Sequence, residues 1–251
     1  METIDICTTA VIRPEILEGT FESFSKCLFS DKNQYRLFIN IDPIGDKKKI
    51  DKMIKVCNKY FGDIVHYQFT IKPSFPKAVL WLWKTACDES NSKYIFHLED
   101  DWVIYRNTDI NHMINILENN KDLACLRLYK EDIPKSTTPR MFNKIYDYKP
   151  HGFFVSRDSS DQFGLNPVLI KKEFIKEALP LLKDDLNPEK QMRAAHPWMH
   201  DFIMKWNYGI YGEPGDKRLV WGKRGKYWRE DQGFEKGKSG FITWVKKGEN
   251  K

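Results

Sequence analysis

The sequence lacks the features that direct a protein into a membrane or an oxidising compartment. No window approaches the run of roughly 20 apolar residues that a membrane-spanning helix needs. The amino terminus has neither the basic stretch nor the apolar stretch of a secretory leader. The five cysteines are widely spaced within apolar segments and form no Cys-x-x-Cys pair, so we expect reduced core thiols rather than disulfides or a zinc site. The sequence therefore predicts a soluble protein of the cytoplasm.

Internal repeats, low-complexity tracts and linker-like segments are also absent. The 251 residues are 41% hydrophobic and 14% aromatic, which is enough for a sizeable core. Charge is unevenly spread, because residues 217–251 hold eleven lysines and arginines against four acids, a balance of +7 in a chain of net charge +6. This basic segment also contains Trp221, Trp228 and Trp244, which are candidates for stacking on a sugar or a base. It indicates an anionic partner, although a solvated tail is the alternative.

Apolar runs alternate with helical patterns along the first half of the chain. Strand-like runs occur at four places, residues 4–12, 35–41, 64–70 and 94–98. The segments between them have helical patterns, two of which begin with proline in the first turn. Strands that alternate with helices in this way predict a mostly parallel sheet covered by helices on both faces.

The pattern is less regular in the second half. Residues 130–150 lack periodicity, so a long functional or mobile loop is expected there. Short strands are expected at residues 152–155 and 208–211, and residues 188–207 predict one long helix that begins with proline.

Three consecutive acids follow the fourth strand-like run. Residues 94–102 read Tyr-Ile-Phe-His-Leu-Glu-Asp-Asp-Trp, so Glu99, Asp100 and Asp101 come directly after an apolar strand. In open α/β sheets, ligands bind beyond the carboxyl ends of the strands. Adjacent carboxylates repel one another unless a cation, hydrogen-bond donors or water neutralise them, and a divalent metal is the obvious candidate. A solvated acidic turn is the alternative, but the return to an apolar residue at Trp102 favours a site.

The sequence Leu98-Glu99-Asp100-Asp101-Trp102 resembles the acidic metal motif of the GT-A fold glycosyltransferases, which use nucleotide sugars as donors. The resemblance implies a GT-A-like α/β fold, with a Rossmann-like, mostly parallel central sheet flanked by helices and a mixed acceptor-side half. It also implies that Asp101 ligates Mn²⁺ or Mg²⁺ bridging the donor diphosphate. Glu99 and Asp100 would then lie near the ribose and the transferred sugar.

This resemblance implies one GT-A-like domain with three parts. Residues 1–129 would be the nucleotide-sugar-binding half and residues 130–216 the acceptor and catalytic half. Residues 217–251 would be a basic, aromatic carboxyl-terminal segment.

Polar residues also close the first two strand-like runs. Thr9, Ala10 and Arg13 follow the first run, and Asp42 follows the second. The family places the donor nucleotide across these two strand ends, which implies that Asp42 accepts a hydrogen bond from a base N–H. Arg13 can pair with a phosphate. Turn chemistry explains the pair Asp42-Pro43 equally well.

The segment from Gly222 to Glu230 combines glycines, cations and aromatic residues. Arg224, Lys226 and Arg229 can neutralise a leaving diphosphate if the segment folds over the donor as a lid. The same residue types can instead bind along an anionic acceptor, and the sequence leaves both uses open.

An inverting glycosyltransferase needs a carboxylate that takes the proton of the acceptor hydroxyl. Glu189 lies roughly where related enzymes carry this base, and Asp161 is its rival. Glu189 is also explained as an acid at a helix amino terminus, and a retaining mechanism requires neither residue. Three histidines are expected to be ordinary core or surface residues, namely His97, His196 and His200.

Together these features predict a metal-dependent glycosyltransferase that moves a sugar from a UDP-sugar to an acceptor hydroxyl. The charge distribution alone favours a hydroxymethylated pyrimidine in viral or phage DNA as the acceptor, which would place the enzyme in the host cytoplasm. The alternatives are a glycosyltransferase of surface polysaccharide or glycoprotein synthesis, a nucleotidyltransferase, and a non-catalytic nucleic-acid-binding protein. The transferred sugar and the oligomeric state do not follow from the sequence.

Overall fold

The computed structural model describes residues 2–157, 163–222, 224–236 and 244–246. A ten-stranded mixed sheet runs through the molecule in the order β3-β2-β1-β4-β10-β6-β11-β9-β8-β7. Four strands of the first half pair in parallel at one end of this sheet: β1 (Thr3–Ile12), β2 (Gln34–Gly45), β3 (Val65–Phe69) and β4 (Tyr94–Glu99). The parallel arrangement expected for the first half is therefore confirmed.

The second half of the chain completes the same sheet. Strand β10 (Val168–Lys171) lies between β4 and β6 (Leu123–Leu128) and is antiparallel to both. Strand β11 (Asn207–Tyr211) is parallel to β6, and β9 (Phe153–Ser156) pairs with it in the antiparallel direction. Both halves thus contribute strands to one continuous sheet.

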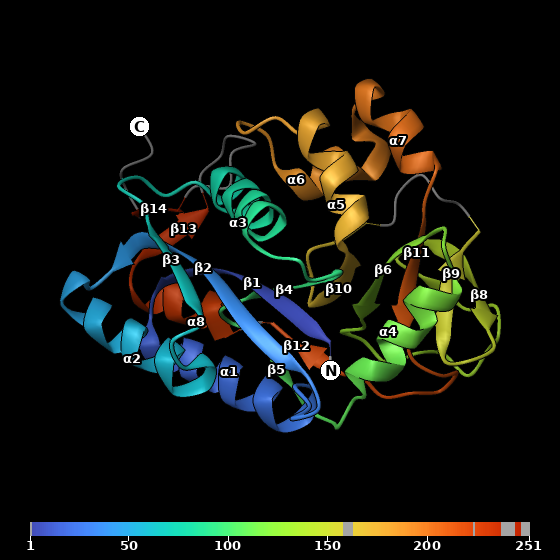
Figure 1. The fold of residues 1–251 in the computed structure, drawn as a ribbon, viewed down its shortest axis with the longest axis horizontal. Coiled ribbons are helices and arrows are strands. Elements are labelled where there is room, and N and C mark those ends of the chain that lie inside the picture. Colours follow the sequence, from blue (N-terminus) through green and yellow to red (C-terminus); the bar gives the residue numbers. More distant parts are fainter. Residues whose placement is uncertain (1, 158–162, 223, 237–243, 247–251) are drawn as a thin grey trace.

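Helices cover both faces of the sheet (Figure 1). Helices α1 (Pro14–Cys27), α2 (Ile50–Phe61) and α4 (Ile110–Asn119) pack on one face, and a short 3-10 turn (Lys47–Lys49) leads into α2. The opposite face carries α3 (Phe75–Glu89) and α5 (Lys172–Ala178), which is followed by a second 3-10 turn (Leu179–Leu181). Strand β1 is buried on both faces, which explains its continuous apolar sequence.

The expected loop at residues 130–150 contains two strands. Strand β7 (Arg140–Met141) pairs with β8 (Lys144–Lys149), which pairs in turn with β9. The expectation of an irregular loop holds for residues 130–139 and was wrong for residues 140–149. Strand β8 has no apolar alternation that would predict it, since it contains two lysines and Asp147 and buries only Tyr146.

The long helix expected over residues 188–207 was also wrong. The segment breaks into α6 (Pro188–Lys190), a π-helical turn (Gln191–Ala195), a 3-10 turn (Pro197–Met199) and α7 (His200–Met204). The break occurs at His196, which is extended with φ −129° and ψ 126°. Proline at the next position disfavours the helical conformation of the residue before it.

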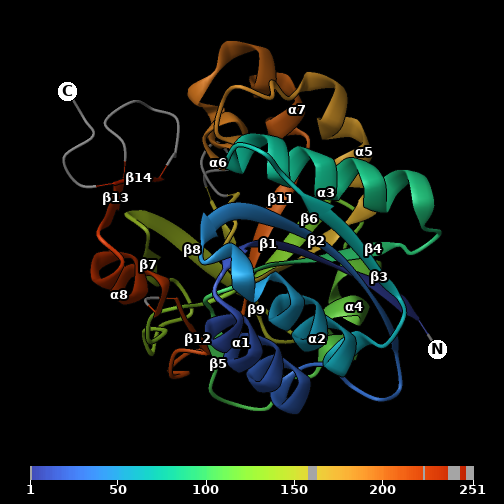
Figure 2. The same cartoon turned by 90° about the vertical axis from the view of Figure 1, so that its left-hand side faces the viewer.

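The carboxyl-terminal segment turns back to the end of β4. Strand β12 (Val220–Trp221) pairs with β5 (Val103–Ile104), which directly follows the three acids. Helix α8 (Arg224–Asp231) comes next, and β13 (Phe234–Lys236) pairs with β14 (Trp244–Lys246). Figure 2 shows α8 with this hairpin at one side of the molecule. Within the described ranges, no helix has the length and apolar character to cross a membrane.

Candidate active site

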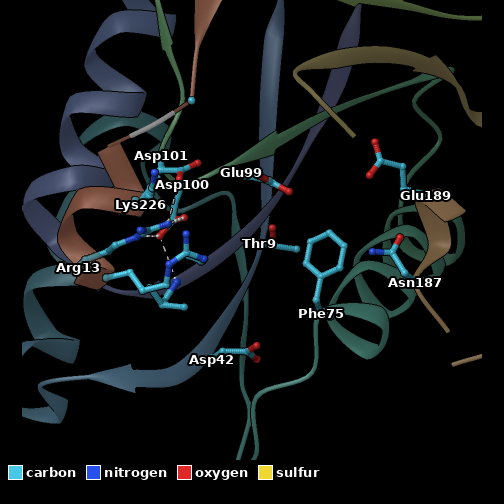
Figure 3. A pocket seen from close by; sticks show the side chains of 16 residues that line it. Thr9, Arg13, Asp42, Phe75, Glu99, Asp100, Asp101, Asn187, Glu189 and Lys226 are labelled. Carbon is cyan, nitrogen blue, oxygen red and sulfur yellow. Dashed lines mark hydrogen bonds and ion pairs between the residues drawn. The ribbon is translucent and has the colours of Figure 1, made fainter. Parts of the chain in front are cut away.

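A cavity of about 300 Å³ lies at the carboxyl ends of β1, β2 and β4 (Figure 3). Most of the residues singled out from the sequence line it: Thr9, Ala10, Arg13, Asp42, Glu99, Asp100, Asp101, Glu189, Lys226 and Arg229. Arg224 does not line the cavity, because its guanidinium packs against Gly19 of α1. Asp161 lies outside the described residues. The fold therefore brings residues from distant parts of the chain to one place.

Asp100 is held in a buried ion pair with Arg13. The Nε and Nη2 atoms of Arg13 donate to the two carboxylate oxygens at 2.8 and 2.5 Å, and both side chains are 4% exposed. The backbone N–H of Val11 also donates to Asp100, at 3.1 Å. This geometry fixes Arg13 at the junction of β1 and α1, where it is the last residue before the helix.

One guanidinium nitrogen of Arg13 remains without an acceptor. Nη1 is buried and has no hydrogen-bond partner among the described residues, whereas Nη2 lies 3.6 Å from Asp101. Burial by itself lowers the pKa of Arg13, but the charge and hydrogen bonds of Asp100 outweigh it, so the pKa is raised and the side chain stays cationic. An anion at Nη1 would satisfy this donor.

Asp101 and Glu99 are carboxyl groups in a poorly solvated place. Burial raises the pKa of Asp101 to about 6, an effect that the charge of Arg13 and the backbone N–H of Gly225 oppose. Burial and the nearby charge of Asp101 raise the pKa of Glu99 to about 8, and the indole N–H of Trp102 donates to Glu99 at 3.3 Å. A bound cation would favour the ionised form of both groups.

The protein alone does not provide a complete metal site in the part of the chain that the structure describes, since no three His, Cys, Asp or Glu side chains converge. Divalent ions that bind nucleotides are often held by one or two carboxylates together with substrate phosphates. Asp101 fits this shared arrangement, because it lies in the cavity and its ion pair with Arg13, at 3.6 Å, is longer than the 2.5 Å pair of Asp100. Asp100, which is saturated by Arg13, does not fit it.

Asp42 lies near the carboxyl end of β2, which runs on to Gly45, and next to the start of α3. Its Oδ1 accepts hydrogen bonds from Asn40 at 3.0 Å and Thr70 at 2.6 Å, and its Oδ2 accepts one from the backbone N–H of Ser74 at 3.1 Å. Burial raises its pKa, which these hydrogen bonds partly oppose. Oδ2 can accept one more bond from the cavity side.

Glu189 lies on the opposite side of the cavity from Arg13 and Asp101 (Figure 3). Its Oε1 accepts hydrogen bonds from Arg193 at 2.5 Å and from the backbone N–H of Leu165 at 3.2 Å. Oε2 accepts none from the residues that the structure describes, so this oxygen remains available.

Phe75 and Asn187 are cavity residues that were not anticipated from the sequence. The ring of Phe75 lies between Thr9 and Asn187 in Figure 3, and Asn187 lies beside Glu189. Phe75 begins α3 just after the carboxyl end of β3, and that position was a usable signal. Asn187 caps α6, which reads as an ordinary helix start in the sequence.

Helix α8 covers the Arg13 side of the cavity. Gly225 of α8 packs against Arg13 and Asp101, and Lys226 and Arg229 line the cavity. The ring of Trp228 lies over the Arg13 guanidinium, with 5.5 Å between the Cζ atom of Arg13 and the centre of the ring. Trp228, a candidate for stacking on a sugar or base, thus stacks on a protein side chain instead.

No protein-family model matches the sequence, and no curated protein matches it. The fold, in contrast, matches solved structures. The structure of S. aureus TarS has a TM-score of 0.58 and 11% identity, over 88% of this chain and 36% of the TarS chain. The chain has a GT-A fold.

Two further structures with this fold contain ligands. S. aureus TarS 1–349 in complex with UDP has a TM-score of 0.53 and 11% identity, over 88% of this chain and 60% of the TarS fragment. GalNAc-T7 with UDP, GalNAc and Mn²⁺ has a TM-score of 0.53 and 10% identity, over 84% of this chain and 42% of GalNAc-T7. The chain thus spans less than two thirds of the length of each of these proteins.

Proposed function

We propose that the chain is a glycosyltransferase that takes a sugar from a nucleotide sugar, with a UDP-sugar as the donor. The observation that carries the proposal is the cavity, in which the carboxylates at the end of β4 meet the cations Arg13, Lys226 and Arg229. A nucleotide sugar has the matching groups, a hydrogen-bonding base and an anionic diphosphate. The UDP complex of TarS, a protein of the same fold, supports UDP as the nucleotide.

In this proposal the donor lies across the ends of β1 and β2. Asp42 accepts a base N–H through Oδ2, and Thr9 and Ala10 contact the nucleoside. Arg13 donates Nη1 to a phosphate oxygen, which would supply the acceptor that this buried nitrogen lacks among the described residues. Glu99 faces the transferred sugar.

Lys226 and Arg229 are assigned to the leaving diphosphate, since both line the cavity from α8. Positive charge near the developing anion stabilises the transition state. Arg224, which packs against Gly19, would act only by holding α8 in place. Asp100 is assigned to Arg13 rather than to the donor.

The proposed metal ion is Mn²⁺ or Mg²⁺, anchored by Asp101 and by the donor diphosphate. Such an ion supplies Lewis-acid charge to the leaving group. The structure of GalNAc-T7 with UDP, GalNAc and Mn²⁺ supports this choice.

Glu189 is the proposed base for an inverting transfer, with Asp161 as its rival. Support comes from its place across the cavity from Asp101 and from Oε2, which accepts no hydrogen bond from the described residues. Arg193 and Leu165 hold the other oxygen and thereby orient the carboxylate.

The donor chemistry is tested by Mn²⁺-dependent hydrolysis and transfer with a panel of nucleotide sugars. We expect Asp101→Asn to lower turnover at least about 100-fold, because the metal loses its protein anchor. Asp88→Asn, which removes an exposed acid of α3, is the matched control and should leave turnover unchanged. Full activity of Asp101→Asn, or no turnover of any nucleotide sugar by the wild type, would contradict the proposal.

The proposed acceptor is a hydroxymethylated pyrimidine in viral or phage DNA, supported by the +7 balance of residues 217–251. Contacts to DNA phosphates make binding weaken steeply with salt. The test offers hydroxymethylcytosine DNA, hydroxymethyluracil DNA and simple glycans with each donor, at about 50 and about 200 mM salt. Transfer to glycans alone would favour an enzyme of polysaccharide or glycoprotein synthesis, and DNA binding without any turnover would favour a non-catalytic protein.

A further inference from the structure

The guanidinium of Arg13 is enclosed on several sides by groups from distant parts of the chain. Asp100 holds Nε and Nη2, and Gly225 packs against Nη1. The ring of Trp228 covers one face of the guanidinium, with its centre 5.5 Å from Cζ of Arg13. This enclosure leaves Arg13 only 4% exposed, so its orientation depends on all of these neighbours.

Trp228 also contacts the ring of Phe234 of β13. The two rings are nearly parallel, with an interplanar angle of 9° and centroids 6.4 Å apart. Arg13, Trp228 and Phe234 therefore form a stack that joins the β1–α1 junction to the carboxyl-terminal segment. Stacking of a guanidinium on an indole ring is attractive and directional, so the stack restrains the plane of Arg13.

The position of Nη1 follows from this restraint. Asp100 fixes one edge of the guanidinium, and rotation about that edge would move Nη1 away from Gly225. The ring of Trp228 opposes such a rotation because it covers the face of the group. Nη1 then stays beside Gly225, which lines the cavity, and it is a buried donor without an acceptor in the described parts of the chain.

We propose that Trp228 is a positioning residue for Arg13, which it holds so that Nη1 meets a diphosphate oxygen of the donor. This inference rests on the proposed function and adds a role for α8: the helix organises the phosphate-binding arginine through its aromatic face. Trp228 does not touch the sugar or the base in this arrangement. Any residue with an aromatic face at position 228 should largely preserve the effect.

The experiment measures binding of inorganic pyrophosphate in EDTA, and of UDP, to the full chain by calorimetry. We expect Trp228→Leu to raise both dissociation constants about tenfold, and Trp228→Phe to stay within about threefold of the wild type. Tyr227→Leu, an exposed residue of the same helix, is the control and should not change binding. The thermal midpoint of each variant shows whether the fold is intact.

A second arm separates an action through Arg13 from a direct contact. In an Arg13→Lys background, which keeps the charge but removes the planar group, Trp228→Leu should change binding less than about twofold. In steady-state assays, Trp228→Leu should raise KM for the donor while kcat stays within about twofold.

Three results would overturn the inference. The first is unchanged binding by Trp228→Leu, and the second is a loss of affinity in Trp228→Phe as large as that in Trp228→Leu. The third is a full tenfold loss of affinity when Trp228→Leu is made in the Arg13→Lys background. A wild type that binds pyrophosphate and UDP but transfers no sugar would contradict the proposed function instead. The positioning role would still be decided by the binding data in that case.

Discussion

At the scale of single residues, three consecutive acids have three different surroundings. Asp100 is neutralised by Arg13, Asp101 meets Arg13 at 3.6 Å and the Gly225 amide, and Glu99 accepts from Trp102. In the sequence these acids look equivalent. Their difference comes from Arg13, which lies 87 positions from Asp100 in the chain and reaches it only in the folded sheet.

Asp100→Asn should destabilise the protein by about 3–5 kcal/mol, because it leaves the buried charge of Arg13 without its partner. Urea unfolding followed by circular dichroism measures the change. The control is Glu22→Gln, which removes the exposed partner of Lys26 and should have no measurable effect. Equal stability of Asp100→Asn and the wild type would show that the pair contributes nothing.

Glu99 should make the stability of the metal-free protein depend on pH. Burial raises its pKa from 4.5 to about 8, so between these values the folded state holds a proton that the unfolded chain releases. The contribution of Glu99 to stability is therefore complete below the unfolded pKa of 4.5, and it is lost as pH rises through the folded pKa of about 8. The free energy of unfolding of the wild type, minus that of Glu99→Gln, should decrease from about pH 5 to about pH 8. A difference that stays constant over this range would contradict the raised pKa.

At the scale of elements, the placement of α8 depends on two close contacts of glycine. Gly222 packs against the ring of Trp102, and Gly225 packs against Arg13 and Asp101. A Cβ atom at either position would overlap these neighbours. The acid segment and the carboxyl-terminal segment therefore approach each other more closely than any other residue type allows.

Gly225→Ala tests this contact. Alanine favours a helix over glycine by about 1 kcal/mol, so a weaker attachment of α8 would report the clash rather than a loss of helix propensity. We expect faster cleavage of the chain after residue 222 in limited proteolysis, and weaker binding of UDP. As the control, Tyr227→Ala in the same helix should be cleaved at the wild-type rate. Cleavage of Gly225→Ala at the wild-type rate would contradict the prediction, because it would show that Arg13 and Asp101 shift to make room for the added methyl group.

Elements with strong local patterns could be predicted from the sequence. The strands β1 to β4 and the helices between them follow from apolar periodicity and from proline at helix starts, and the cavity residues that end β1, β2 and β4 follow from the strand ends. The long helix predicted after Pro188 was wrong because Pro197 disfavours the helical conformation of His196. Phe75 was missed although its position after the carboxyl end of β3 was a usable signal. Asn187 could not be predicted, because its place in the cavity depends on how α6 packs.

At the scale of the whole molecule, one sheet joins the two halves of the chain. A buried ion pair reinforces this connection, because Lys172 at the start of α5 donates to Asp5 of β1 at 2.6 Å. Both side chains are at most 4% exposed. The expected division at residue 129 therefore does not separate two sheets, although the single-domain organisation stays a prediction.

We expect the chain to unfold in one cooperative transition. Tryptophan fluorescence and far-ultraviolet circular dichroism should give the same urea midpoint, because β10 of the second half separates β4 from β6. Asp5→Asn should shift both midpoints together. Different urea midpoints from fluorescence and from circular dichroism would indicate that the two halves unfold independently.

The insertion of β10 also bears on how the protein is made. Until residue 171 has left the ribosome, β4 and β6 each lack a neighbour, and the unpaired backbone N–H and C=O groups along their edges stay open to pairing with other chains. Strand β4, which ends in the acids, is thus paired on both sides later than β1 and β2, while β3 stays at the sheet edge. Synthesis of the nascent chain passes through a period in which this edge is vulnerable to aggregation, and chaperones that bind extended segments would act during that period.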